Sequence, residues 1–167
     1  MEDKLVLTEG IILSILFSLG IFIPLYRNPV GQIMSYPKKI REKVESLPQY
    51  KDCIKQKEKK HLLIKILSIF IFALVLYIIA YMSNARTFNQ VFRHVFMIFF
   101  IVNIYDLIIM DLLIFRNVKK FRIPGTENMD KEYKECGHHI VGFFCGIGIG
   151  IMVAFLAGLY NQVFALL

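Results

Sequence analysis

Cysteine is scarce in this chain, and the placement of its three residues excludes one class of membrane enzyme. No two of Cys53, Cys136 and Cys145 form a CxxC pair, the motif that thiol–disulfide oxidoreductases use. The four-helix thiol oxidoreductases are therefore excluded. All three cysteines are expected in cytoplasmic loops or near the inner leaflet, where thiols stay reduced, so we expect no disulfide bond.

Other absences narrow the class further. The chain has no series of short segments with alternating apolar and polar residues, which a membrane β-barrel would require. Signatures of lipid phosphatases and phosphatidyltransferases are missing as well. The first apolar segment lacks a basic leading region, since Glu2 and Asp3 precede Lys4 and Glu9 follows, and it lacks a small-x-small cleavage site. We therefore expect a retained helix there and not a secretory signal.

Apolar residues, by contrast, are abundant. They make up 56% of the 167 residues, above the roughly 45–50% of soluble domains, and the mean hydropathy is +0.56. A helix needs about 20 apolar residues to cross a bilayer. Four segments reach that length, at about residues 5–26, 62–82, 91–115 and 140–162. The sequence predicts an all-α polytopic membrane protein, a single domain over residues 1–167 with four transmembrane helices.

The charge distribution predicts the orientation of these helices. The loop at residues 27–61 holds ten Lys or Arg against four acidic residues, and the loop at 116–139 holds six against four. Short loops rich in Lys and Arg stay in the cytoplasm. We therefore expect a multi-pass protein of the plasma (inner) membrane with both termini outside. The net charge of +7 then reflects topology, and no nucleic-acid partner is expected.

The first basic loop contains a short amphipathic helix. Ser35 is the expected N-cap, Pro37 follows in the first turn, and Ile40, Val44 and Leu47 recur on one face among basic residues. Such a helix can lie in the headgroup layer with its cations among anionic lipids. It can equally pack its apolar face onto the bundle. Anionic headgroups are the expected partners of both basic loops.

Small residues recur every four positions in the last segment. A ridge without bulky side chains lets a neighbouring helix approach closely, and such packing drives helix association in lipid. The partner is either a helix of the same chain or the same helix of a second copy, which would make a homo-oligomer. The ridge consists of Gly142, Gly146, Gly150, Ala154 and Gly158.

Polar residues inside the third apolar segment are the best pointer to function. A carboxylate at that depth costs about 2.5–3.5 kcal/mol on insertion scales and rarely faces lipid. Asn103, Asp106 and Asp111 fall within an arc of about 140° on an α-helix and so share a face. One interpretation is a site for a proton, a cation or a headgroup. The other is internal pairing, with Asn103 bonded across helices and the carboxylates paired to Arg116, Lys65 or a tyrosine hydroxyl.

Two further clusters of polar residues lie near the ends of the expected spans. Near the outer face, Glu9 is expected to pair with Arg93 beside His94. At the start of the last helix, a Cys-Gly-His-His sequence offers metal-type ligands, although adjacent histidines point in different directions on a helix. If the inner ends of the last two helices adjoin, carboxylates and histidines converge at one cytoplasmic mouth, where they could hold a divalent cation or transfer protons. The candidate site residues are Asn103, Asp106, Asp111, Arg116, Glu127, His138 and His139.

One stretch of the chain resembles a known group of proteins. The resemblance depends on three features of the sequence. They are the motif Asn103-x2-Asp106-Leu107-x3-Asp111-x2-Ile114-Phe115, the motif Ile123-Pro124-Gly125-Thr126-Glu127 and a histidine before a glycine-rich last helix. Over about residues 103–146 this resembles a group of uncharacterised small bacterial four-helix integral membrane proteins. The resemblance implies a class without a mechanism. It also implies that one functional region contains Asp106, Asp111, Pro124, Gly125, Thr126, Glu127 and His139.

We expect a binding, scaffold or accessory protein with a polar intramembrane site that opens to the cytoplasm. A component of a proton- or cation-coupled transporter is the first alternative, and it would need a homo-oligomer. A membrane-embedded enzyme acting on a lipid-like substrate is the second, with Arg116, Lys119 and Lys120 countering substrate charge. The sequence indicates no particular cofactor.

Overall fold

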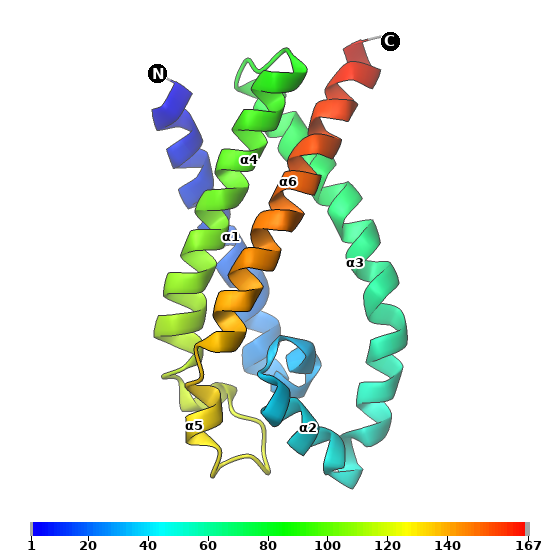
Figure 1. The fold of residues 1–167 in the computed structure, drawn as a ribbon, viewed down its shortest axis with the longest axis vertical. Helices are drawn as coiled ribbons and strands as arrows, with labels where there is room; N and C mark the ends of the chain where they lie inside the picture. The colour runs from blue at the N-terminus through cyan, green and yellow to red at the C-terminus, as the bar shows by residue number, and fades with distance from the viewer. Residues whose placement is uncertain (1, 166–167) are drawn as a thin grey trace.

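The computed structural model describes the backbone of residues 2–165 and the side chains of residues 4–50, 64 and 66–165. The described residues contain helices and no strand, which confirms the all-α class (Figure 1). Cys53 and Lys65 lie outside the described side chains. In chain order the elements are α1 (Glu2–Arg27), the 3₁₀-helix η1 (Pro29–Ser35), α2 (Lys38–Ser46), α3 (Pro48–Met82), α4 (Phe88–Tyr105), the π-helix η2 (Asp106–Phe115), the 3₁₀-helix η3 (Lys119–Phe121), α5 (Asp130–Tyr133) and α6 (Gly137–Ala165).

The long helices run between the same two ends of the molecule, and α3 diverges from α6 toward the end that carries α2 (Figure 1). α4 packs against both α1 and α6, and α3 packs against α6. Both chain termini lie at the same end as the turn between α3 and α4, which we name the terminal end. The opposite end, which we name the loop end, carries α2 and α5. The two predicted basic loops thus lie together, away from the termini.

Three helical segments are long and apolar enough to cross a membrane: Lys4–Arg27, Phe88–Phe115 and a third within Asp130–Ala165. The expected second span, residues 62–82, lies partly outside the described side chains, and its described apolar part is the shorter Ile66–Met82. Large apolar side chains on these helices are exposed. Exposed apolar faces on several helices are what a lipid environment accommodates and water does not.

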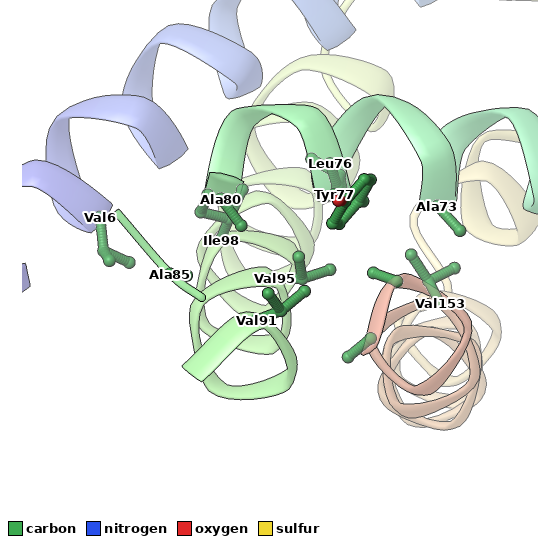
Figure 2. Packing of buried hydrophobic residues seen from close by; sticks show 12 residues of the cluster. Val6, Ala73, Leu76, Tyr77, Ala80, Ala85, Val91, Val95, Ile98 and Val153 are labelled. Atoms are coloured by element: carbon green, nitrogen blue, oxygen red, sulfur yellow. The ribbon is translucent and has the colours of Figure 1, made fainter. Parts of the chain in front are cut away.

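The terminal end has its own apolar core (Figure 2). Small and β-branched residues let α3, α4 and α6 approach closely there, and Ala80, Val91 and Val95 are fully buried. A capping box starts α4, in which Thr87 Oγ1 accepts from the Gln90 backbone N–H and Gln90 Oε1 accepts from the Thr87 backbone N–H. The chain therefore turns sharply from α3 into α4.

The glycine ridge of α6 faces α4 of the same chain. A Cβ atom on Gly146 would lie 2.9 Å from Cγ of Asn103, closer than real contacts allow. Ala154 is fully buried, whereas nothing lies within 4 Å of a Cβ atom at Gly142. One end of the ridge is thus open, and the remainder is a close helix contact. The glycines whose Cβ atoms would collide with α4 side chains are Gly146, Gly150 and Gly158.

The loop end has a second core, and α2 contributes to it. Ile40 and Val44 are fully buried against residues of η1, η3 and α5. The apolar face of this amphipathic helix therefore packs onto the bundle, as one of its two interpretations expected, and the other, contact with anionic headgroups, stays a prediction. Ser35 is not its N-cap, contrary to prediction: α2 begins at Lys38, after Pro37. The residue before a proline is restricted to extended conformations, so Tyr36 is extended and ends η1.

A tight turn closes the loop end. The Tyr133 hydroxyl accepts from the Ile123 backbone N–H at 3.0 Å and lies 2.7 Å from Thr126 Oγ1, with Tyr133 and Thr126 both buried. Gly125 has φ +91°, and a Cβ atom there would lie 2.7 Å from Leu47 Cδ1. Only glycine fits both the backbone and the space. This turn holds η3 against α1 and so closes one side of the cavity described next.

Candidate functional site

A cavity of about 220 Å³ lies at the loop end. Residues of α1, η1, η2 and η3 meet there, so the cavity is lined by segments that lie far apart in the sequence. Its lining contains two carboxylates, three polar side chains and an apolar remainder that includes three phenylalanines. The lining residues are Ile21, Phe22, Leu25, Gln32, Ser35, Tyr36, Asp106, Met110, Asp111, Ile114, Phe115 and Phe121.

The π-helix η2 determines how the two aspartates are presented. Hydrogen bonds in a π-helix link residues five apart, and such segments occur frequently at functional sites. Asp106 and Asp111 are five apart, so they fall on successive turns of the same side, and both line the cavity. On an α-helix the same two residues would diverge by about 140°. The π-helix thus aligns two carboxylates that an α-helix would splay.

Asp111 is paired with a histidine from α6. Its Oδ2 lies 3.0 Å from Nδ1 of His139, whose side chain is only 3% exposed. The Phe115 ring packs edge-on against the imidazole at 5.6 Å between centroids. Nε2 of His139 is buried and has no hydrogen-bond partner among the described residues. The pair therefore ties η2 to α6 and fixes the orientation of the Asp111 carboxylate.

Asp106 differs from Asp111 in having no such partner. Its side chain is partly buried and faces the cavity. No described residue donates a hydrogen bond to it or lies within ion-pair distance, and its electrostatic neighbours are Asp111 and His139. An unpaired carboxylate within a long apolar helix is energetically costly. Asp106 lines the cavity without a hydrogen-bond or ion-pair partner among the described residues.

Part of the cavity wall is aromatic. Tyr36 is buried, donates a hydrogen bond to the Phe121 carbonyl oxygen at 2.6 Å and packs edge-on against Phe115. Burial, together with the nearby Tyr133, raises the pKa of the Tyr36 hydroxyl, so this group stays protonated and keeps donating. Ser35 lies beside it, and its carbonyl oxygen is 3.2 Å from Nε2 of His138.

The other predicted site residues lie elsewhere. Asn103 donates to the Phe143 carbonyl oxygen at 3.0 Å and so faces α6, not the cavity. Arg116 does not line the cavity, its Nε is buried without a hydrogen-bond partner, and no described carboxylate pairs with it. Glu127 is exposed and accepts from the Gly125 backbone N–H at 2.8 Å, which lowers the pKa of its carboxyl group. His138 is exposed.

The predicted convergence is therefore smaller than expected. Asp106, Asp111 and His139 come together, whereas Glu127 closes its own turn and Arg116 stays apart. The metal interpretation of the Cys-His-His sequence has no geometric support: the part of the chain with described side chains contains no group of three or more His, Cys, Asp or Glu residues that could hold an ion.

A second polar group lies at the terminal end. Oε2 of Glu9 is 2.7 Å from Nε2 of His94, and the Ser83 hydroxyl donates to Oε1 of the same carboxylate. The prediction paired Glu9 with Arg93; in the structure Arg93 and His94 both line an adjoining cavity of about 450 Å³. This polar group joins α1 to the turn between α3 and α4 and to the start of α4.

Polar contacts continue between α1 and α4. Ser14 and Ser18 are buried on the face of α1 that meets α4. Ser18 Oγ donates to the Ser14 carbonyl oxygen at 2.8 Å and lies 3.0 Å from the Tyr105 hydroxyl, the residue before Asp106. We name the set from Glu9 through Ser14 and Ser18 to Tyr105 and Asp106 the α1–α4 polar interface.

Sequence reasoning missed the part of the site that η1 supplies. Gln32, Ser35 and Tyr36 come from a stretch whose prolines and glycine indicated only a turn and a helix start. The one available signal was a tyrosine and two polar residues directly after an apolar span. Comparison of the chain with protein-family models, curated proteins and solved structures gives no match.

Proposed function

We propose that this chain is a small integral membrane binding protein, acting as a scaffold or accessory subunit, whose ligand occupies the cavity beside Asp106 and Asp111. Four transmembrane helices with both termini outside would place the loop end, and therefore this cavity, at the cytoplasmic side of the plasma (inner) membrane. The common position of both termini and of the α3–α4 turn supports this topology (Figure 1), as do the basic loops at the other end.

The observation that carries the proposal is the Asp106 carboxylate, which lines the cavity without a described hydrogen-bond or ion-pair partner. Internal pairing explains Asp111, which has His139, and Asn103, which has a backbone carbonyl. It does not explain Asp106. A carboxylate within an apolar membrane-spanning segment is costly, so we expect it to have a functional role. The cavity beside Asp106 has room for a ligand that would pair with it.

The basic surface of α2 supports a membrane-facing loop end. The apolar face of α2 is covered by the bundle, and Lys38, Lys39 and Lys43 of the same helix are exposed. Two of these lysines make only loose ion pairs, to Glu42 at 3.7 Å and Glu135 at 3.8 Å. Anionic headgroups attract such a surface by about 1 kcal/mol per basic residue. We propose anionic lipids as partners of this surface.

Native mass spectrometry of protein released from mild detergent tests the proposed site. We expect the wild type to retain a non-protein mass and Asp106→Asn to lose it, since the amide has no charge to offer the ligand. Asp130→Asn is the matched control, because Asp130 is exposed and pairs with Arg122 outside the cavity. Equal retention by Asp106→Asn and wild type would contradict the proposed site.

Reporter fusions test the topology. Alkaline phosphatase, which is active only outside the cytoplasm, is expected to be active when fused after the C-terminus and inactive when inserted in the turn between Pro124 and Glu127. Green fluorescent protein should give the opposite pattern. The reverse result would place the cavity at the outer face and contradict a site that opens to the cytoplasm.

A second candidate function is a component of a proton- or cation-coupled transporter, which the α1–α4 polar interface favours. This interface contains a carboxylate near each end, Glu9 and Asp106, with hydroxyl groups between them. Transport would need a homo-oligomer, and the open positions Gly142 and Gly148 offer room for a second copy. Proteoliposomes that dissipate a pH gradient, and fail to do so with Ser18→Ala, would support this function over simple binding.

A further inference from the structure

The cavity at the loop end combines negative charge with an aromatic wall. Asp106 and Asp111 supply two carboxylates, and no lysine or arginine is among the described lining residues. Phe22, Phe115 and Phe121 form much of the apolar remainder. His139 offsets part of this negative charge when it is protonated, but no described cation lies within ion-pair distance of Asp106. The electrostatics therefore favour a cation.

The same lining argues against a metal ion as that cation. Calcium takes six to eight oxygen ligands, and magnesium requires nearly ideal octahedral coordination. Within the described side chains, no group of three or more His, Cys, Asp or Glu residues is arranged so that it could hold a metal ion. Aromatic faces do not replace oxygen ligands, but they do bind substituted ammonium groups through cation–π attraction.

We propose that the cavity binds an organic cation, a substituted ammonium group whose charge is met by Asp106 and whose alkyl groups contact the aromatic wall. The inference rests on the proposed function and specifies its ligand class. The cavity volume is compatible with such a ligand. At about 220 Å³ the cavity is smaller than the ~300 Å³ at which cavities for drug-sized ligands begin, and it has room for a headgroup or a small amine. Ser35 and Gln32 add polar groups for a hydroxyl or a further polar substituent.

This ammonium group could belong to a free amine or to the headgroup of a membrane amphiphile. Ile21, Leu25 and Met110 form apolar lining at the inner end of the spans, where an attached hydrocarbon chain would leave the cavity toward lipid. The shared chemistry is the ammonium group, and the chain length of the probe distinguishes the two sources.

Isothermal titration of the purified full-length protein in mild nonionic detergent provides the test. The probes are choline and 3,3-dimethylbutan-1-ol, which has nearly the same shape without the charge. We expect choline to bind at least tenfold more tightly than the neutral alcohol, and Asp106→Asn to reduce choline binding by tenfold or more while Asp130→Asn leaves it unchanged. Dodecyltrimethylammonium binding much more tightly than choline would identify an amphiphile; equal affinity would identify a free amine.

The comparison of the two probes uses the wild-type protein alone, so it holds even if Asp106→Asn folds poorly. Equal affinity for choline and the neutral alcohol, or no binding of choline and dodecyltrimethylammonium, would overturn the organic-cation proposal. The proposed function would survive that result if the retained mass still depended on Asp106 in native mass spectrometry. Loss of both dependences would contradict both proposals.

Discussion

Replacing Gly146 by leucine is expected to lower the free energy of unfolding by about 1–3 kcal/mol, the usual cost of overpacking a filled interface. Cγ of Asn103 would lie 2.9 Å from the new Cβ atom. The Asn103 amide cannot move aside freely, because its Nδ2 donates to the Phe143 carbonyl oxygen. The two helices must separate or the hydrogen bond must break, and either change loosens the α4–α6 contact.

Gly142→Leu is the matched control, one helical turn away on the same ridge. Nothing lies within 4 Å of a Cβ atom there, and leucine is a better helix former than glycine by about 0.5–1 kcal/mol. We expect Gly142→Leu to leave stability unchanged or to raise it slightly. Unfolding in mixed detergent, followed by circular dichroism, measures both variants. Equal destabilisation at the two positions would show that the ridge does not pack on α4.

His94→Leu is expected to be the second most damaging substitution, at about 1–3 kcal/mol, the cost of leaving a buried polar partner unsatisfied. Nε2 of His94 lies 2.7 Å from the Glu9 carboxylate, and the two side chains are 9% and 18% exposed. Without His94, the carboxylate retains only the Ser83 hydroxyl among its described hydrogen-bond partners. The α1–α4 contact at the terminal end should weaken accordingly.

A double-mutant cycle tests the cause of that loss. Removing both partners leaves no unpaired carboxylate, so the Glu9→Leu/His94→Leu protein should be more stable than the sum of the two single losses predicts. We expect a coupling energy of about 0.5–3 kcal/mol, the range for residues in direct contact. Ser83→Ala serves as the milder control. Strict additivity of the two single substitutions would contradict a direct Glu9–His94 pair.

The helical class could be predicted from the sequence because it depends on the length of apolar runs alone. The segments expected at residues 5–26 and 140–162 correspond to α1, Glu2–Arg27, and α6, Gly137–Ala165. The loop that joins the last two helices also allowed their ends to adjoin, and at the loop end the structure pairs Asp111 with His139. Both results follow from connectivity and composition, which a sequence records directly.

The shape of the site could not be predicted in the same way. The π-helix at Asp106–Phe115 occurs in a segment that is apolar on all sides apart from its two aspartates, so its hydrophobic pattern does not distinguish one helical pitch from another. The contribution of η1 depends on Tyr36 reaching the Phe121 carbonyl oxygen across 85 residues. No local pattern encodes a contact at that separation. The start of α2 failed as a prediction because Pro37 restricts the residue before it.

A cryo-EM map of the protein in lipid nanodiscs, bound to a rigid fiducial, tests the central claim most directly. The account predicts non-protein density in the cavity, beside the Asp106 carboxylate and against the rings of Phe22 and Phe115. Asp106→Asn should remove that density while His139 stays beside Asp111. A map in which Asp106 turns outward to lipid, or in which side chains fill the cavity, would contradict a binding site at the loop end.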